Sequence, residues 1–212
     1  RHSSSAASDV YKRQDQNLFH EIYEQQIEKL TFRQIFTHTY IPLINHLGLL
    51  WQTDSLKPAH EHFVSNLIYQ KIALNIAKIP VNKKSNNPTN VLFLPYGEIH
   101  ELGLFFLNYY FQLVGEKVIY LGKSIPFNNL FYLNSQVKNI TWITYFMIDK
   151  TVEEKDEFIS SIGKLLEHTK NKCIIVGNIW DDYKKVNTNN QIIFKSKLEE
   201  LVSVNEVKLS VI

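Results

Sequence analysis

The stretch YGEIHELG, residues 96–103, places a carboxylate and an imidazole at a spacing that could support metal chemistry. Glu98 precedes His100 by two residues, and Gly103 follows three residues later. A loop histidine can coordinate a metal ion while a neighbouring carboxylate orients its other ring nitrogen. The spacing is that of neither a dinucleotide loop nor a P-loop. On its own the motif is also compatible with an ordinary surface loop.

A second stretch, WQTDSLKPAHEH at residues 51–62, combines an aromatic side chain with a Glu-His pair. Trp51 is followed ten residues later by Glu61 and then by His62. Taken singly, the tryptophan could be a core aromatic. The carboxylate could lie on a solvated first helical turn, where the helix dipole favours it. A functional interpretation therefore depends on both stretches occurring together.

Residues 15–80 have the spacing of amphipathic helices, with apolar residues three and four positions apart. We expect a helical bundle that forms a cap. Pro42 should kink or split the second helix. Asp54 or Ser55 is expected to cap the last helix, with Pro58 in its first turn.

Residues 81–90 form a polar linker rich in Pro and Asn, the clearest domain boundary in the chain. In residues 91–212 the period changes, and short apolar runs alternate with helical patterns. Continuous apolar strands joined by helices predict a parallel sheet covered on both faces. We predict a five-stranded, doubly wound, Rossmann-like (flavodoxin-like) domain with strands in VLFLPYG, KVIYLG, ITWITYF, KCIIVGN and QIIFK.

Residues 1–14 differ in composition from the rest, and we interpret them as a non-native leader. Their three basic residues and one acid carry the whole formal excess of +2, so that residues 15–212 are neutral. A neutral chain does not indicate a nucleic-acid surface. If the protein controls DNA, we expect the DNA-reading part to lie upstream.

Cys173 is the single cysteine and lies in an apolar run, which excludes a disulfide framework and favours a reducing, cytoplasmic compartment. No apolar stretch is long enough to span a bilayer, so no membrane association is expected. Because the chain offers no nucleophile–base pair and no phosphate loop, we do not expect catalysis by the protein alone.

The E-x-H-x-x-G motif after the first strand, with VIYLGKSIP after the second, resembles the cobalamin-binding domain. That family usually carries D-x-H-x-x-G, and its histidine is the lower axial ligand of cobalt. The resemblance implies that His100 is the cobalt ligand, Glu98 its hydrogen-bond partner and Gly103 part of the site.

The helical region with W-x9-E-H resembles the cobalamin-dependent, light-sensing repressors of the MerR type. The resemblance implies adenosylcobalamin as cofactor, with Trp51 over the adenosyl group and Glu61 hydrogen-bonded to it. His62 would ligate cobalt once that group leaves. Family members assemble into tetramers, so self-association as a dimer or tetramer is expected.

Many cobalamin domains carry S-x-L near the third strand and Gly-Gly after the fourth, which enclose the nucleotide tail of the cofactor. Here Tyr145 stands at the serine position, or Thr144 if the alignment shifts by one residue. The first glycine corresponds to Gly177, and Asn178 replaces the second. Because of these departures, the resemblance supports the tail pocket less strongly than it supports His100 as the axial ligand.

Three functions follow from these patterns. The first is a cobalamin-binding sensor region of a MerR-type regulator. The second is a corrinoid methyl carrier that partners methyltransferases, and the third is a cofactor-free module with the same fold. The closed upper face implied by the second stretch favours the sensor over the carrier.

Overall fold

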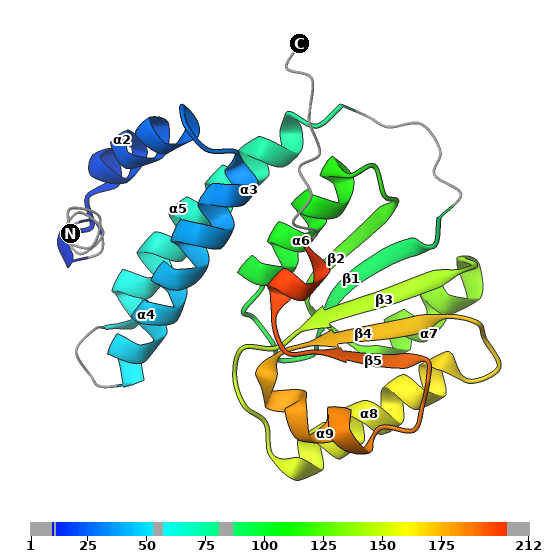
Figure 1. The fold of residues 1–212 in the computed structure, drawn as a ribbon. Helices are drawn as coiled ribbons and strands as arrows, with labels where there is room; N and C mark the ends of the chain where they lie inside the picture. Colours follow the sequence, from blue (N-terminus) through cyan, green and yellow to red (C-terminus); the bar gives the residue numbers. More distant parts are fainter. Residues whose placement is uncertain (1–9, 11, 53–56, 81–86, 203–212) are drawn as a thin grey trace. The chain divides into compact units, whose positions relative to one another are not determined.

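A computed structural model of the chain describes residues 10, 12–52, 57–80 and 87–202. The chain divides into two compact units, Arg1–Lys78 and Ile79–Ile212, and each is described by itself. The first unit is helical, and the second is built on a parallel sheet (Figure 1).

The first unit consists of amphipathic helices with side-chain caps where the sequence supplies them. The described helices are α2 (Gln16–Ile27), α3 (Phe32–Ile35), α4 (Ile41–Gln52) and α5 (Pro58–Ala77). Asp15 accepts a hydrogen bond from the amide of Leu18 at 2.9 Å, and Thr31 forms a capping box with Gln34. Before α2, Val10 is buried and its carbonyl accepts from the amide of Asp15.

The kink expected at Pro42 is a π-helical turn, η1 (Phe36–Tyr40), between α3 and α4. The amide of Ile41 donates to the carbonyl of Phe36, five residues back. Proline has no amide hydrogen and its ring crowds the preceding turn of a regular helix. The wider π turn relieves that crowding without ending the helical path.

The start of α5 corrects one expectation. Pro58 is in the first turn as predicted, but Lys57 is in the N-cap position and makes no side-chain cap. The predicted cap was therefore wrong, and Asp54 and Ser55 lie outside the described residues.

The buried face of α5 contains a charged residue within an otherwise apolar stripe. Its buried positions recur at helical spacing: Val64, Leu67, Ile68, Lys71 and Ile72. The ammonium of Lys71 lies 4.0 Å from the ring centroid of Tyr23 and 3.9 Å from a carboxylate oxygen of Glu24. Burial lowers the pKa of Lys71, although the charge of Glu24 opposes the shift.

The second unit has the predicted five-stranded parallel sheet, in the order β2-β1-β3-β4-β5. The strands are β1 (Thr89–Pro95), β2 (Val118–Ile125), β3 (Ile140–Tyr145), β4 (Lys172–Val176) and β5 (Ile192–Lys195). In this order the direction in which successive strands are added to the sheet reverses between β1 and β3, and such sheets bind ligands at the carboxyl ends of these strands.

Helices follow each strand and cover both faces of the sheet. They are α6 (Leu102–Leu113), α7 (Phe127–Gln136), α8 (Val152–Leu166), η2 (Asn178–Trp180), α9 (Asp181–Val186) and η3 (Leu198–Leu201). The sequence reading missed η2 and α9, because a run of Asp, Lys and Asn conceals these short turns. No helix in the described parts of the chain is both long and apolar enough to cross a membrane.

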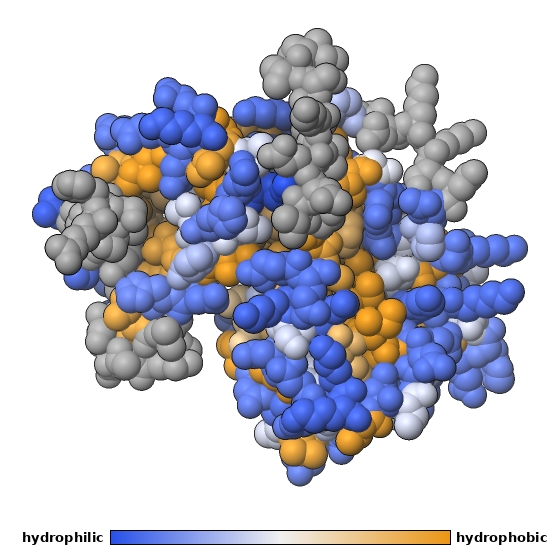
Figure 2. All heavy atoms as spheres, viewed as in Figure 1, coloured by the Kyte–Doolittle hydropathy of each residue, from blue (hydrophilic) through white to orange (hydrophobic). Residues whose placement is uncertain are grey.

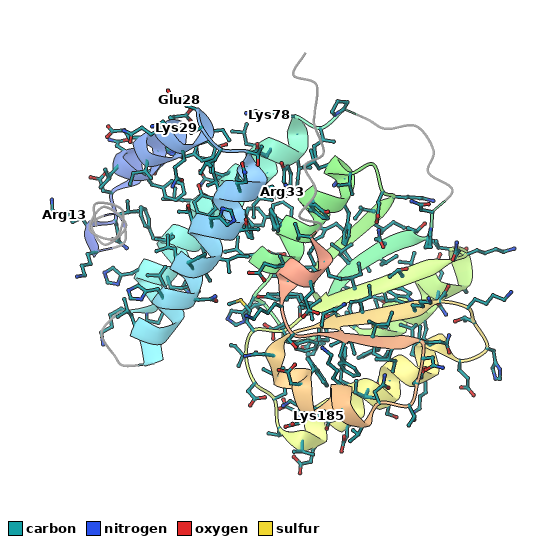
Figure 3. All side chains as sticks on the ribbon, viewed as in Figure 1. Arg13, Glu28, Lys29, Arg33, Lys78 and Lys185 are labelled. Carbon is teal, nitrogen blue, oxygen red and sulfur yellow. The ribbon has the colours of Figure 1, made fainter. Side chains whose placement is uncertain are left out.

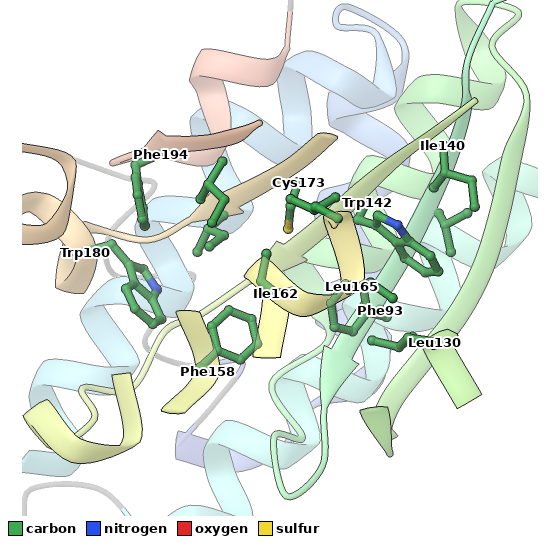
Figure 4. Packing of buried hydrophobic residues seen from close by; sticks show 14 of the residues in the cluster. Phe93, Leu130, Ile140, Trp142, Phe158, Ile162, Leu165, Cys173, Trp180 and Phe194 are labelled. Carbon is green, nitrogen blue, oxygen red and sulfur yellow. The ribbon is translucent and has the colours of Figure 1, made fainter. Parts of the chain in front are cut away.

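The main core lies between the sheet and helices α7 and α8. Phe158, Ile162 and Leu165 of α8 point toward a strand layer that includes Trp142 and Cys173 (Figure 4). In contrast, hydrophilic residues predominate on the surface over α8 and α9 (Figure 2). Lys185 on α9, labelled in Figure 3, pairs with Asp182 at 2.9 Å and is exposed.

Candidate cofactor-binding site

The loop between β1 and α6 carries the histidine motif at the carboxyl edge of the sheet. The amide of Glu98 donates to the carbonyl of Pro95, so the chain turns immediately after β1. Gly97 has a φ of +84°, a conformation that favours glycine. Its amide donates to Oγ of Ser124, which ties the loop to the end of β2.

Glu98 and His100 form a tight hydrogen-bonded pair on this loop. Nδ1 of His100 lies 2.6 Å from Oε1 of Glu98. The same oxygen accepts from the amides of Ile99 at 3.0 Å and His100 at 3.1 Å. The side chain of Glu98 is only 3% exposed, whereas that of His100 is 37% exposed. The carboxylate is thus a buried support for a histidine that reaches solvent.

Burial alone would raise the pKa of the Glu98 carboxyl. The hydrogen bonds and charge of His100, with the amide of Ile99, outweigh burial and hold the pKa below its ordinary value. Glu98 therefore stays ionised at neutral pH and accepts a hydrogen bond from Nδ1–H of His100. That arrangement leaves the lone pair of the neutral ring on Nε2, the nitrogen that can coordinate a metal.

Glu101 is a further loop residue that the sequence reading did not select. It accepts from the hydroxyl of Tyr120 at 2.8 Å and forms an ion pair with Lys123 at 3.1 Å. Both partners lie on β2, so Glu101 holds the end of the loop against the neighbouring strand. The only sign of this role in the sequence is that Glu101, an acidic residue, directly follows His100.

Gly103 and Tyr145, both predicted site residues, lie against each other. A Cβ atom at Gly103 would stand 2.5 Å from Cε1 of Tyr145. Burial, with a smaller effect of Glu199, raises the pKa of Tyr145 to about 12. Thr144, the alternative for the serine position, is fully buried, and its hydroxyl has no hydrogen-bond partner within the described chain. Tyr145 is therefore the residue that fills the space beside Gly103.

Gly177 closes the carboxyl end of β4. Its φ is +142°, and an added Cβ would stand 2.6 Å from the carbonyl oxygen of Phe146. The positive φ and the close carbonyl oxygen each require a glycine at position 177. Asn178 follows as the first residue of η2. The predicted site residues on β3 and β4 thus meet at one edge of the sheet.

The second motif lies in the helical unit. Glu61 is in the first turn of α5, where it accepts a hydrogen bond from Ser65 and lies 3.2 Å from Nδ1 of His62. The side chain of His62 is 65% exposed. Trp51 belongs to α4, and its side chain lies outside the described part of the structure. No group of three or more His, Cys, Asp or Glu side chains is arranged to hold a metal within the described residues.

Comparisons with known proteins agree with the two-part architecture. Residues 12–74 match the family described as "B12 binding domain". This segment covers the helical unit and includes Glu61 and His62. The chain also has the fold of the monomethylamine corrinoid protein of Methanosarcina barkeri. That structure gives a TM-score of 0.74 with 11% identity, over 92% of each chain.

A curated relative is the HTH-type transcriptional repressor CarH of Myxococcus xanthus, which is 25% identical over 130 residues. The similar region is 61% of this chain and 42% of the relative, so the match spans about two-fifths of the repressor. The helical segment is therefore similar to B12 binding domains, and the sheet-containing chain has a corrinoid-protein fold.

The Glu98–His100 pair fits the cobalt of a corrinoid, whereas the contact between Tyr145 and Gly103 does not fit its nucleotide tail. The buried Glu98 carboxylate and the half-exposed His100 ring are the arrangement that orients a metal-ligating histidine. The ring of Tyr145 packs against Gly103 and leaves no room for even a Cβ atom there, so a nucleotide tail could pass between the two residues only if the ring moved. The axial position therefore fits better than the tail position.

Proposed function

We propose that this protein binds cobalamin with His100 as the lower axial ligand of cobalt. The observation that carries the proposal is the 2.6 Å hydrogen bond between Nδ1 of His100 and the buried Glu98. It sets the ring orientation and the tautomer, with the lone pair on Nε2. The similarity of the helical segment to B12 binding domains supports cobalamin as the bound molecule.

We further propose that the chain is the sensor region of a MerR-type transcriptional regulator, and that adenosylcobalamin is its form of the cofactor. Similarity to a transcriptional repressor supports this role. The neutral charge of residues 15–212 is consistent with a DNA-reading part located elsewhere in the regulator. When bound, adenosylcobalamin supplies a cobalt–carbon bond that light can break.

In this proposal the helical unit covers the upper face of the cofactor. Trp51 covers the adenosyl group, and Glu61 accepts from its ribose hydroxyls. His62 takes the upper coordination position when that group is absent. Because the side chain of His62 is 65% exposed, its imidazole has room to turn toward a ligand, a movement that would give up the 3.2 Å contact with Glu61.

Spectroscopy of the reconstituted chain tests the proposal. The protein is loaded with adenosylcobalamin in the dark, and visible spectra are recorded before and after illumination. We expect a histidine-ligated spectrum in the dark and a bis-histidine spectrum after light. His62→Ala should change only the second spectrum. His60→Ala is the matched control, because His60 neighbours the pair but bonds to the carbonyl of Lys57.

The alternatives give different results in the same experiment. A methyl carrier must leave the upper face of cobalt open, so His62→Ala would not alter its illuminated spectrum. A cofactor-free module would bind no cobalamin at all, and the contact between Tyr145 and Gly103 is the observation that favours it.

A further inference from the structure

Strand β2 lies at one edge of the sheet, beside β1, and its carboxyl end is irregular (Figure 1). The register of the two strands shifts twice, once between Leu92 and Phe93 and again between Phe93 and Pro95. Over this stretch β2 has two more residues than β1. Bulges of this kind bend a strand and re-aim its side chains, often next to functional sites. The bulged end of β2 therefore directs side chains at the loop that follows β1.

This bulged end contacts the histidine loop, residues 96–101, at two points. Near the start of the loop, the amide of Gly97 donates to Oγ of Ser124 at 3.2 Å. At the end of the loop, Glu101 accepts from the hydroxyl of Tyr120 at 2.8 Å. Strand β2 thus holds the loop on both sides of the histidine.

Ser124 has a backbone conformation that a serine rarely adopts. Its φ is +58°, in the left-handed region that favours glycine. An L-residue is strained there, and such residues persist where the surrounding structure requires them, often at functional sites. A glycine would avoid the strain but would lose the hydroxyl that accepts from Gly97. The side chain of Ser124 is therefore kept against the preference of its own backbone.

The hydrogen bond at Gly97 bears directly on the Glu98–His100 pair. Gly97 immediately precedes Glu98 in the chain. Oε1 of Glu98 accepts from two backbone amides of the loop and from Nδ1 of His100. These three bonds form only while the loop backbone is folded around the carboxylate. A loop released at Gly97 would lengthen the 2.6 Å contact between Glu98 and the imidazole.

We propose that Ser124 is a positioning residue for the histidine of this loop. Its hydroxyl holds the amide of Gly97 and so keeps the carboxylate of Glu98 against Nδ1 of His100. The strained backbone of Ser124 is retained because this hydrogen bond sets the tautomer of the histidine. The inference rests on the proposed function, in which Nε2 of His100 binds cobalt.

Two substitutions separate the hydroxyl of Ser124 from its backbone conformation. Ser124→Gly removes the hydroxyl and relieves the strain, whereas Ser124→Ala removes the hydroxyl and keeps the strain. The tautomer of His100 is read from the ring ¹⁵N shifts of the ¹⁵N-histidine-labelled, corrinoid-free chain, with His100→Ala to identify the signal. The spectra are recorded at about pH 9, above the ordinary pKa of an imidazole.

We expect the Nδ1–H tautomer in the wild type. In both Ser124 variants the ratio of Nε2–H to Nδ1–H tautomer should rise about three-fold, the scale expected when one hydrogen bond is weakened. Ser124→Gly should unfold at a higher urea concentration than Ser124→Ala, because only glycine relieves the strain.

His168→Gly is the matched control. His168 also has a positive φ, +59°, and its side chain is 90% exposed beyond the end of α8. Glycine should relieve the same kind of strain at His168 and leave the tautomer of His100 unchanged.

An unchanged tautomer ratio in both Ser124 variants would overturn the proposal. A change in Ser124→Ala alone would also overturn it, because the effect would then come from the backbone. In a separate titration with cobalamin, both variants should bind about ten-fold more weakly, the lower end of the range for residues that orient a metal ligand. A wild type that binds no cobalamin would contradict the proposed function, whereas the tautomer ratio would still decide the role of Ser124.

Discussion

Gly103 at the start of α6 and Tyr145 at the end of β3 are complementary in shape: the glycine lacks the atom that would collide with the tyrosine ring. The two residues are 42 positions apart, and an added Cβ would stand 2.5 Å from the ring. In this protein the glycine of the E-x-H-x-x-G motif therefore makes room for a side chain of the same chain.

A double-mutant cycle tests this relationship. Gly103→Ala should destabilise the fold by about 1–3 kcal/mol, because the ring of Tyr145 must move. In a Tyr145→Ser background the same change should be neutral or stabilising, because alanine favours the helix. The free energy of unfolding in urea measures both effects.

Gly163→Ala on α8 is the control for the cycle. No atom lies within 4 Å of the Cβ that it would add, so we expect stabilisation of up to about 1 kcal/mol. If Gly103→Ala stabilised the protein as much as Gly163→Ala, the packing of Tyr145 on Gly103 would be disproved.

The same side chain should control which corrinoid the protein accepts. If Tyr145 fills the tail position, the wild type should bind cobinamide, which lacks the nucleotide tail, at least as tightly as cobalamin. Tyr145→Ser should improve cobalamin affinity relative to cobinamide by roughly ten-fold, or about 1.4 kcal/mol. Equilibrium titrations followed by visible absorbance give both affinities. An unchanged ratio would place the tail elsewhere.

The cap makes a prediction about the upper ligand. Stacking of a base on an aromatic side chain contributes about 1–3 kcal/mol in nucleic-acid complexes, and we use that scale here. Trp51→Ala should therefore weaken adenosylcobalamin about ten-fold more than methylcobalamin. Dark titrations with the two cofactors measure this difference. Equal losses would favour the methyl-carrier alternative.

Lys71 should lower the stability of the helical unit at neutral pH. Its folded pKa is depressed, so the unfolded chain binds more protons between that pKa and the ordinary value of 10.5. Stability should then rise with pH through this window. Lys71→Met should stabilise the protein by on the order of 1 kcal/mol at pH 7, and the gain should shrink as the pH approaches 10.

Thermal unfolding across pH 7–10 measures the effect of Lys71→Met. Lys29→Met is the control, because Lys29 is exposed just beyond α2 and is not among the groups that shift the pKa of Lys71 (Figure 3). A gain of equal size in both variants, or one that does not depend on pH, would show that the charge of Lys71 is not the cause.

The sequence predicted the features that depend on local periodicity. The five strands, their parallel order and the placement of Glu98 and His100 on the loop after β1 follow from alternating apolar runs and glycines. Short turns without a clear apolar period were missed, as in α9.

Other features depend on contacts between distant residues and could not be read from the sequence. The buried position of Lys71 results from its place on the apolar stripe of α5, not from its residue type. The contact between Gly103 and Tyr145 arises only when the start of α6 and the carboxyl end of β3 meet.

Electron paramagnetic resonance of the cobalt(II) form tests the central claim, that His100 is the lower ligand, most directly. The protein is labelled with ¹⁵N-histidine, loaded with cobalamin of natural isotopic composition and reduced to cobalt(II). A ligating ¹⁵N atom splits each cobalt line into a doublet, whereas the ¹⁴N of the cofactor's own base gives a triplet. We predict doublets in the labelled wild type and their loss in labelled His100→Ala. Triplets in the labelled wild type would show that cobalt keeps its own base, and would contradict the account.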